Sequence, residues 1–313
     1  MSKTKKFFVS LTAILLAYII GFGVWTVFNH YKKISKTGLC NAIPYGFGKE
    51  ATVILLAGQS NAAGCSKDEY LKKKADPEKY AEYEKGYEHI YINYFTSGTN
   101  QSDGFVKAKV RQGEFGEYFG PELGLAEKLH ELHPEKNFFI IKYAWGGTNL
   151  CEQWRSPSSG QAGPLYNSFF AFAKNSIEYL KVRGYKVKIE GMCWMQGEAD
   201  SMQEESTLNY GRHLSNFIQD IRSELTHYAS NDGIAFVDAY IADSFFWKYY
   251  IQLNEEKQKV ANSAPNNVVI DTIAHGLSIL EEPEGEPDIA HYDSLSEIKL
   301  GNLFAEEISK FLD

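Results

Sequence analysis

The chain has 313 residues, of which 44% are hydrophobic and 23% charged, and its formal net charge is -8. This composition is typical of a globular protein that is long enough to bury a large core, in two domains or in one large α/β domain. The negative charge and the lack of an Arg/Lys cluster argue against nucleic acid as a partner.

The first fifty residues differ from the rest and predict a membrane anchor followed by a linker. Residues 1–6 form a basic segment with three lysines, and residues 7–28 contain no charged side chain. At about 1.5 Å per residue, that run spans a hydrocarbon core of about 30 Å. It is too long for an ordinary signal-peptide core, and no clear cleavage site follows it. We therefore expect a transmembrane signal anchor at 7–28, a linker at 29–50 and the main domain at 51–313.

The four cysteines, Cys40, Cys65, Cys151 and Cys193, leave their oxidation state open. They allow three pairings if all are oxidised, and their spacing cannot choose among them. Isolated buried thiols are at least as good an interpretation. The sequence contains no CxxC motif, so a zinc site of the usual spacing is not indicated.

Apolar runs alternate with amphipathic segments from residue 51 onward. The run at 53–57 ends in Gly58-Gln59-Ser60-Asn61, and 89–95 has the alternation of a strand. Further strands are expected at 136–143, 186–195, 234–237 and 268–272, and helices at about 121–132, 165–182, 206–225, 249–261 and 296–311. Such alternation predicts βαβ units and a parallel sheet between helices. Residues 66–88 are expected to form a charged helical insertion that is broken at Pro77.

Several strand ends place reactive or small residues at one edge of this predicted sheet. Ser60 follows the first strand, Gly146 and Gly147 follow the 136–143 strand, and Gln196 follows the 186–195 strand. A late loop supplies Asp288 and His291. We expect Ser60 to be the nucleophile, His291 its general base, and Asp288 the group that orients the imidazole.

An oxyanion formed on Ser60 also needs hydrogen-bond donors. The predicted donors are the Ser60 N–H, an N–H of Gly146 or Gly147, and the side-chain amide of Gln196. Each residue also has a plain structural interpretation: a helix cap for Ser60, turn glycines, and a strand end for Gln196.

Other residues compete for the same roles. Asp293 is an alternative orienting acid, and His275 an alternative base that lacks an acid at the same spacing. Glu198 and Asp200 resemble a glycosidase carboxylate pair, although caps to the local backbone or a buried ion pair are more typical of such residues.

Several sequence blocks resemble the ordered motifs of the SGNH hydrolase superfamily. The similarity is greatest to its sialate O-acetylesterase-like branch, carbohydrate esterase family six, which also includes acetylxylan esterases. The blocks are GQSNAAG, GPELGLA, YAWGGTNL, GPLYN, WMQGEAD and DIAHYDS. They occur in the family's order from about Thr52 to the end of the chain.

The resemblance implies a three-layer α/β/α sandwich with a mainly parallel, five-stranded, flavodoxin-like sheet. It implies a triad of Ser60, His291 and Asp288, with no metal and no cofactor. It also implies that Gln196 replaces the Asn found in the wider superfamily. Ala62 stands where the branch often has Met, a departure that concerns the substrate more than the reaction.

The expected activity is that of a serine esterase that removes O-acetyl groups from carbohydrate, such as acetylated sialic acid or xylan, through an acetyl-serine. Trp145, Trp154, Arg155 and Tyr166 are candidates for contact with a sugar or acyl group, with packing as the alternative. A general short-chain carboxylesterase or thioesterase is the closest rival, and a non-catalytic glycan-binding protein is a further one.

The orientation of the anchor rests on this expected activity. Lysines flank both ends of the apolar run, so the positive-inside rule barely discriminates between orientations. An exported carbohydrate substrate favours a cytoplasmic amino terminus and an extracytoplasmic domain, with a secreted protein as the alternative.

Overall fold

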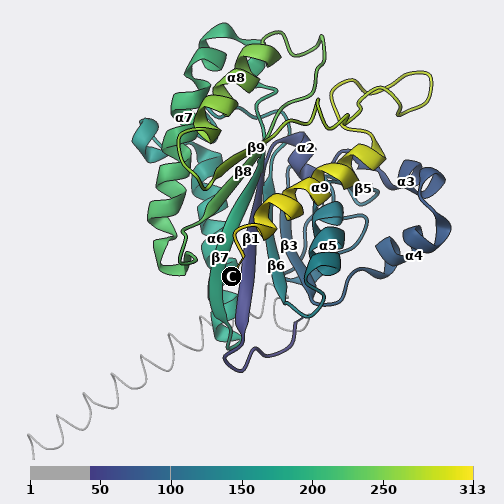
Figure 1. The fold of residues 1–313 in the computed structure, drawn as a ribbon, viewed down its shortest axis with the longest axis vertical. Coiled ribbons are helices and arrows are strands. Elements are labelled where there is room, and N and C mark those ends of the chain that lie inside the picture. The colour runs from purple at the N-terminus through teal and green to yellow at the C-terminus, as the bar shows by residue number, and fades with distance from the viewer. Residues whose placement is uncertain (1–42, 99, 313) are drawn as a thin grey trace, which may run out of the picture.

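The computed structural model describes residues 43–98 and 100–312, and its centre is a sheet of seven strands (Figure 1). The strand order is β4-β3-β6-β1-β7-β8-β9; every neighbouring pair is parallel except β3 and β4. The strands are β1 (Glu50–Gly58), β3 (Ile90–Thr96), β4 (Val106–Lys107), β6 (Phe138–Ala144), β7 (Lys186–Met195), β8 (Ala235–Ala239) and β9 (Asn267–Ile270). A separate two-stranded sheet joins β2 (Ser66–Lys67) to β5 (Tyr118–Phe119).

The prediction of five strands was wrong in number, although the five-stranded core is present. Strands β6-β1-β7-β8-β9 follow the order 2-1-3-4-5 that is typical of flavodoxin-like folds. The sheet extends beyond β6 through β3, which matches the strand expected at 89–95, and through β4. With only two residues, β4 is too short to leave a pattern in the sequence.

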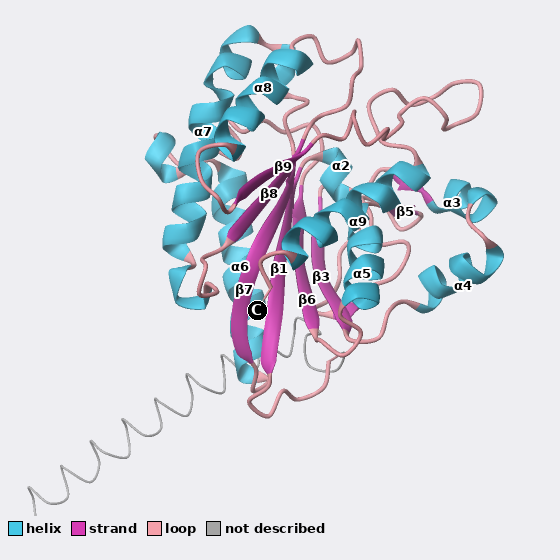
Figure 2. Ribbon diagram, viewed as in Figure 1, coloured by secondary structure: helices cyan, strands magenta, loops and turns pink. Residues whose placement is uncertain are grey.

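Helices cover both faces of the sheet, which gives the predicted three layers (Figure 2). On one face lie α5 (Pro121–Leu132) and α9 (Ser294–Ser309), and on the other α6 (Pro164–Val182) and α7 (Glu204–Glu224), with α8 (Tyr250–Ala261) beside α7. The backbones of α5 and α9 touch at their crossing, because a Cβ on Gly124 would lie 2.0 Å from the Ile298 carbonyl oxygen.

The central strand β1 is buried along almost its whole length. Residues 51–58 are all buried, and β6 and β7 flank β1 up to Gly58. In parallel strands the carboxyl ends lie at the same edge, so the segments that follow β1, β6 and β7 meet there. That edge holds the short helix α2 (Ser60–Ala63).

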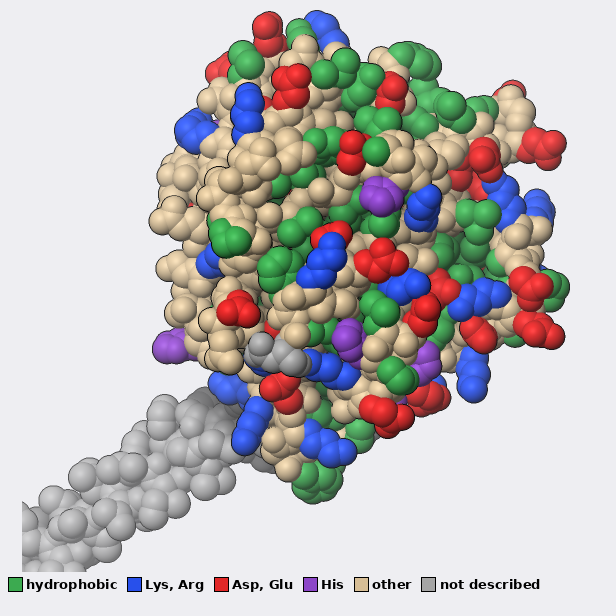
Figure 3. Space-filling view, viewed as in Figure 1, with side chains coloured by type: hydrophobic (Ala, Val, Ile, Leu, Met, Phe, Trp, Pro, Cys, Tyr) green, Lys and Arg blue, Asp and Glu red, His purple; other side chains and the backbone are tan. Residues whose placement is uncertain are grey.

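The charged insertion is helical, as predicted, and breaks before Pro77. It contains α3 (Asp68–Lys74) and α4 (Pro77–Lys85), and Asp76 caps α4 by accepting a 2.9 Å hydrogen bond from the Glu78 N–H. Charged side chains of both signs cover this end of the molecule (Figure 3). Tyr80 and Tyr83 are buried, so these aromatic residues pack within the domain.

The described chain enters the domain at the edge opposite α2. Near this entry the Gly46 N–H donates to the Arg183 carbonyl (2.8 Å), and the Tyr185 hydroxyl donates to the Pro44 carbonyl (3.2 Å). The predicted anchor at 7–28 and most of the linker lie outside the described residues. Within residues 43–98 and 100–312, no helix combines the length and the apolar character that a membrane span requires.

Candidate active site

Ser60 stands on a sharp turn that glycine makes possible. Gly58 ends β1 with φ of +143°, and the Gln59 N–H donates to the Met195 carbonyl at 2.9 Å. Ser60 then begins α2, and 9% of its surface is exposed. The first N–H groups of a helix have no partner within it, and no hydrogen bond to another described residue uses that of Ser60.

Gly58→Ala should destabilise the protein and displace Ser60. A Cβ at this position would lie 1.9 Å from the Met195 carbonyl oxygen, and the φ angle is strained for any L side chain. We expect a loss of at least about 2 kcal/mol in the free energy of unfolding, measured by urea denaturation. Gly116→Ala is the matched control, because a Cβ there meets no atom within 4 Å. Equal stability of the two variants would contradict the prediction.

Asp288 and His291 form a hydrogen-bonded pair on one loop. The His291 Nδ1 lies 2.7 Å from the Asp288 Oδ2. The hydrogen bond from His291 lowers the pKa of Asp288 below its usual value, so the carboxylate is ionised at neutral pH. The rival acid Asp293 has another role: its carboxylate accepts hydrogen bonds from the N–H groups of Glu281 and Glu282.

Asn61 ties this loop to the serine turn. Its Oδ1 accepts a 3.1 Å hydrogen bond from the Tyr292 N–H, and its Nδ2 donates to the Ala290 carbonyl at 3.4 Å. The same Nδ2 donates to Glu198 Oε1 at 2.7 Å. The residue that follows Ser60 thus holds the residues on both sides of His291.

The two predicted glycines differ in what their N–H groups do. The Gly146 N–H donates to the Ser97 hydroxyl at 2.9 Å. The Gly147 N–H makes no hydrogen bond to any other described residue, and Gly147 is exposed with φ of +68°. An ideal Cβ on Gly146 would lie 3.6 Å from the Ser60 Cβ, so this turn lies directly beside the serine.

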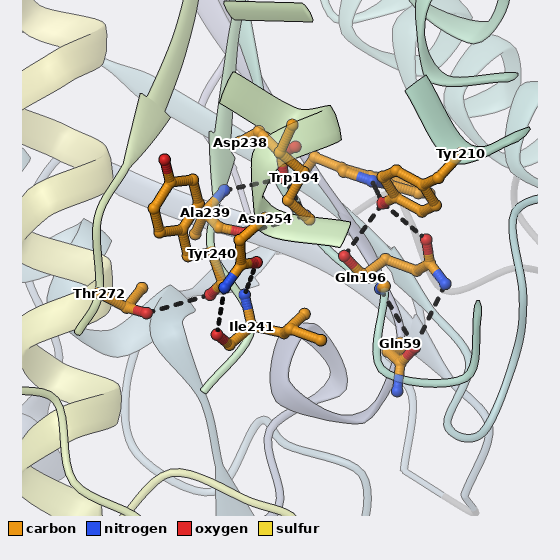
Figure 4. Close-up of polar contacts among 12 residues, drawn as sticks. Gln59, Trp194, Gln196, Tyr210, Asp238, Ala239, Tyr240, Ile241, Asn254 and Thr272 are labelled. Carbon is orange, nitrogen blue, oxygen red and sulfur yellow. Dashed lines mark hydrogen bonds and ion pairs between the residues drawn. The ribbon is translucent and has the colours of Figure 1, made fainter. Parts of the chain in front are cut away.

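Gln196 reaches the same edge of the sheet, but its side chain is fully buried and engaged (Figure 4). The Nε2 donates to Asp200 Oδ2 (2.6 Å), to the Thr148 carbonyl (2.9 Å) and to Gln59 Oε1 (3.3 Å). Its Oε1 accepts from the Tyr210 hydroxyl at 2.9 Å. These contacts leave the amide no hydrogen for an oxyanion in this conformation, so we assign Gln196 to support of the neighbouring turns.

Glu198 and Asp200 are buried and bind protein groups, which corrects the glycosidase alternative. Asp200 accepts hydrogen bonds from the Leu150 and Cys151 N–H groups at 2.8 and 3.3 Å. Burial raises the pKa of both carboxyl groups. Neither side chain is exposed, and a glycosidase pair must flank a bound sugar.

The four candidates for substrate contact divide into two pairs. Trp154 is fully buried and donates to the Thr148 hydroxyl at 2.9 Å, and Tyr166 is buried against Phe170. Their burial corrects the expected contact and assigns both to packing. Trp145 and Arg155 are partly exposed, and Trp145 directly precedes Gly146.

A cavity of about 140 Å³ lies beside the Asp288–His291 pair. Cys65, Tyr70 and Tyr118 contribute to its wall, together with both members of the pair. Cys65, Cys151 and Cys193 are free thiols, and Cys40 lies outside the described residues. Among the described residues, we find no cluster of three or more His, Cys, Asp or Glu side chains that could hold a metal ion.

Sequence reasoning missed three residues beside the site: Asn61, Ser97 and Glu114. The position of Asn61 directly after Ser60 was a usable signal, because a turn residue often binds a neighbouring loop. Ser97 and Glu114 lie in irregular segments without a motif, and only the fold brings them together.

Comparisons with known proteins identify the family of the chain and its fold. The family model described as "Carbohydrate esterase, sialic acid-specific acetylesterase" matches residues 50–310. No curated protein sequence matches the chain.

Solved structures show the fold. A protein from Arabidopsis thaliana has 19% sequence identity and a TM-score of 0.59, over 83% of this chain and 99% of its own. NanS has 17% identity and a TM-score of 0.59, over 84% of this chain and 98% of its own. A carbohydrate acetylesterase from Xanthomonas citri has 18% identity and a TM-score of 0.54, over 83% of this chain and 56% of its own. Since the family model spans nearly the whole described region, the chain belongs to the sialic acid-specific acetylesterase family of carbohydrate esterases.

Proposed function

We propose that this protein is a serine esterase that removes O-acetyl groups from carbohydrate, with Ser60, His291 and Asp288 as its catalytic residues. The observation that carries the proposal is the 2.7 Å Asp288–His291 pair on a loop that Asn61 ties to the Ser60 turn. Family membership supports ester hydrolysis on a carbohydrate.

The pair defines the direction of proton transfer. Because His291 Nδ1 is hydrogen-bonded to Asp288, the other ring nitrogen, Nε2, is the one that takes the Ser60 proton. The Ser60 Oγ then attacks the acetyl carbonyl, and the resulting oxyanion accepts hydrogen bonds from the N–H groups of Ser60 and Gly147. His291 returns the proton to the sugar oxygen as the C–O bond breaks, which leaves an acetyl-serine.

Water completes the cycle. His291 removes a proton from a water molecule, whose oxygen attacks the acetyl-serine carbonyl. The second tetrahedral intermediate collapses to acetate, and the proton returns to Ser60. Each turnover consumes one water and releases one acetate, one proton and one free sugar hydroxyl.

The cavity of about 140 Å³ beside the Asp288–His291 pair is not lined by Ser60, Gly146 or Gly147, so its size does not set the length of the acyl group. Acetyl as the acyl group rests on family membership. Because an acetyl group is small, most binding energy for an acetylated sugar would come from the sugar.

A substrate panel tests the proposal. The full-length protein would be assayed for Ser60-dependent release of acid from 4-nitrophenyl acetate, 4-nitrophenyl octanoate, O-acetylated sialic acid and acetylated xylan. We expect hydrolysis of the acetate ester and of an acetylated sugar, without hydrolysis of octanoate. Rapid octanoate hydrolysis would favour the general carboxylesterase, and a folded protein inert to the whole panel would favour a glycan-binding role.

Asp288→Asn should lower kcat about 10- to 100-fold. Loss of an orienting aspartate buried in a protease triad costs about 10⁴-fold, because the imidazole adopts the wrong tautomer. The Asp288 side chain is 52% exposed, so water can replace part of its hydrogen bond to His291. Steady-state kinetics on 4-nitrophenyl acetate measures the effect, with Asp232→Asn on an exposed turn as the control. An unchanged kcat would remove Asp288 from the proposed triad.

A further inference from the structure

Glu114 lies at the centre of a group of hydrogen bonds around the Ser60 turn. Its Oε1 accepts from the Ser97 hydroxyl, and its Oε2 accepts from the Cys65 thiol at 2.9 Å. Its backbone N–H donates to the Gly64 carbonyl at 2.9 Å, at the end of the serine helix. Both carboxylate oxygens and the backbone of this one residue thus face the proposed active site.

Ser97 connects Glu114 to the Gly146–Gly147 turn. A serine hydroxyl has a single hydrogen, and the one on Ser97 points to the Glu114 carboxylate. The Ser97 oxygen is left as an acceptor, and the Gly146 N–H donates to it at 2.9 Å. The two hydrogen bonds therefore run in one direction, from the Gly146 N–H to Ser97 and from the Ser97 hydroxyl to Glu114.

The hydrogen bond to Ser97 determines which N–H of the Gly146–Gly147 turn lacks a partner among the described residues. Because Ser97 engages the Gly146 N–H, the Gly147 N–H is the one of these two glycine donors that makes no hydrogen bond to another described residue. The space around the turn is tight: an ideal Cβ on Gly146 would lie 3.0 Å from Glu114 Oε1 and 3.6 Å from the Ser60 Cβ. Glu114 and Ser60 thus both lie close to Gly146.

The negative charge of Glu114 cannot stabilise the oxyanion directly. A carboxylate this close to the turn has the same sign as the oxyanion that forms on the substrate, so its field alone opposes the reaction. Hydrogen bonds to a carboxylate are about twice as strong as those between neutral groups, which makes the contact with Ser97 a rigid one. Any benefit from Glu114 must therefore come from geometry.

We propose that Glu114, acting through Ser97, is a positioning residue that holds the Gly146–Gly147 turn so that the Gly147 N–H serves the oxyanion. The inference rests on the proposed esterase function and goes beyond it, because neither residue touches the reacting atoms.

Whether kcat falls or rises in Glu114→Gln distinguishes a positioning role from a direct effect of the charge. Glu114→Gln keeps the side-chain length, removes the negative charge and turns one accepting oxygen into an NH2 group. If Glu114 acts through position, kcat on 4-nitrophenyl acetate should fall tenfold or more, with KM within twofold and the pH profile unchanged. Ser97→Ala should have a similar effect, and the double variant should lose no more than the larger single loss, because both residues act as one unit.

Ser102→Ala is the matched control for Ser97→Ala. Ser102 lies in the same loop. Its hydroxyl donates to Asn93 Oδ1 and to the Tyr94 carbonyl and accepts from the Tyr94 N–H, and none of these contacts involves the glycine turn. We expect the control to lower the melting temperature as much as Ser97→Ala does, without the loss in kcat. Equal losses of kcat in both variants would reduce Ser97 to a general loop contact and overturn the proposal.

A second readout separates failure of this inference from failure of the proposed function. The full-length protein and its variants would be treated with a fluorophosphonate probe, and labelling of Ser60 would be followed by mass spectrometry. Rapid labelling of the wild type with tenfold slower labelling of Glu114→Gln and Ser97→Ala supports the inference. Equal labelling rates and equal kcat overturn the inference alone, whereas a wild type inert to probe and ester overturns the esterase function and the inference with it.

Discussion

Ser60→Ala should reduce acetate release from 4-nitrophenyl acetate by at least about 10⁴-fold, because the variant lacks the hydroxyl on which the proposed acetyl intermediate forms. Removal of the nucleophile of a serine hydrolase leaves only the rate supplied by oxyanion donors and substrate binding. Ser60 makes no side-chain hydrogen bond to another described residue, and its Cβ can stay in place in the variant. Steady-state kinetics on the full-length protein measures the loss.

The fold of this variant must stay intact for the result to have meaning. We expect a melting temperature within a few degrees of the wild type, because the substitution removes one nearly buried hydroxyl. Ser223→Ala, at an exposed serine near the end of α7, is a control that should keep the activity. Full activity of a folded Ser60→Ala protein would show that the nucleophile lies elsewhere.

Lys142→Met should cost about 3–5 kcal/mol in the free energy of unfolding, because it leaves a buried carboxylate without its counter-ion. Lys142 and Glu122 are both fully buried, and their side chains form a 2.7 Å ion pair. The Lys142 ammonium group also donates to the carbonyls of Ala63 (2.8 Å) and Gln112 (3.0 Å). The Glu122 carboxylate and the two carbonyls thus each lose a hydrogen-bond donor in the variant.

Urea denaturation would measure this loss, with two comparisons. Lys186→Met removes an exposed lysine from the start of β7 and should change stability by less than about 0.5 kcal/mol. Lys142→Met combined with Glu122→Leu removes both charges and should recover part of the loss, because a buried pair is often no better than an apolar one. A Lys142→Met protein as stable as the wild type would show that Glu122 is neutral or solvated.

The prediction from sequence was strongest where a pattern repeats along the chain. The segments that form β1, β6 and β7 were located to within a few residues, because strands buried on both faces are rich in apolar residues. The pair of Asp288 and His291 could be anticipated because the two residues are three positions apart on one loop.

Residues that act through distant contacts left no such pattern. Lys142 interrupts an apolar strand, and nothing local shows that Glu122 and the Ala63 carbonyl surround it. Gln196 differs in another way: its position after a strand predicted a donor for an oxyanion, whereas in the structure its amide donates to Asp200 and to the Thr148 carbonyl. Contacts between segments far apart in sequence decide both cases.

The described chain enters at the edge opposite α2, so attachment near this entry point determines which side of the domain faces away from a support. β1 has nine residues, so at about 3.3 Å per residue the serine turn stands about 30 Å from the entry point. Immobilisation on a bead or a lipid surface through residue 43, where the described chain enters, would leave α2 on the outward side (Figure 1). Such an enzyme would reach acetyl groups on chains that extend away from the support and would miss those lying flat against it.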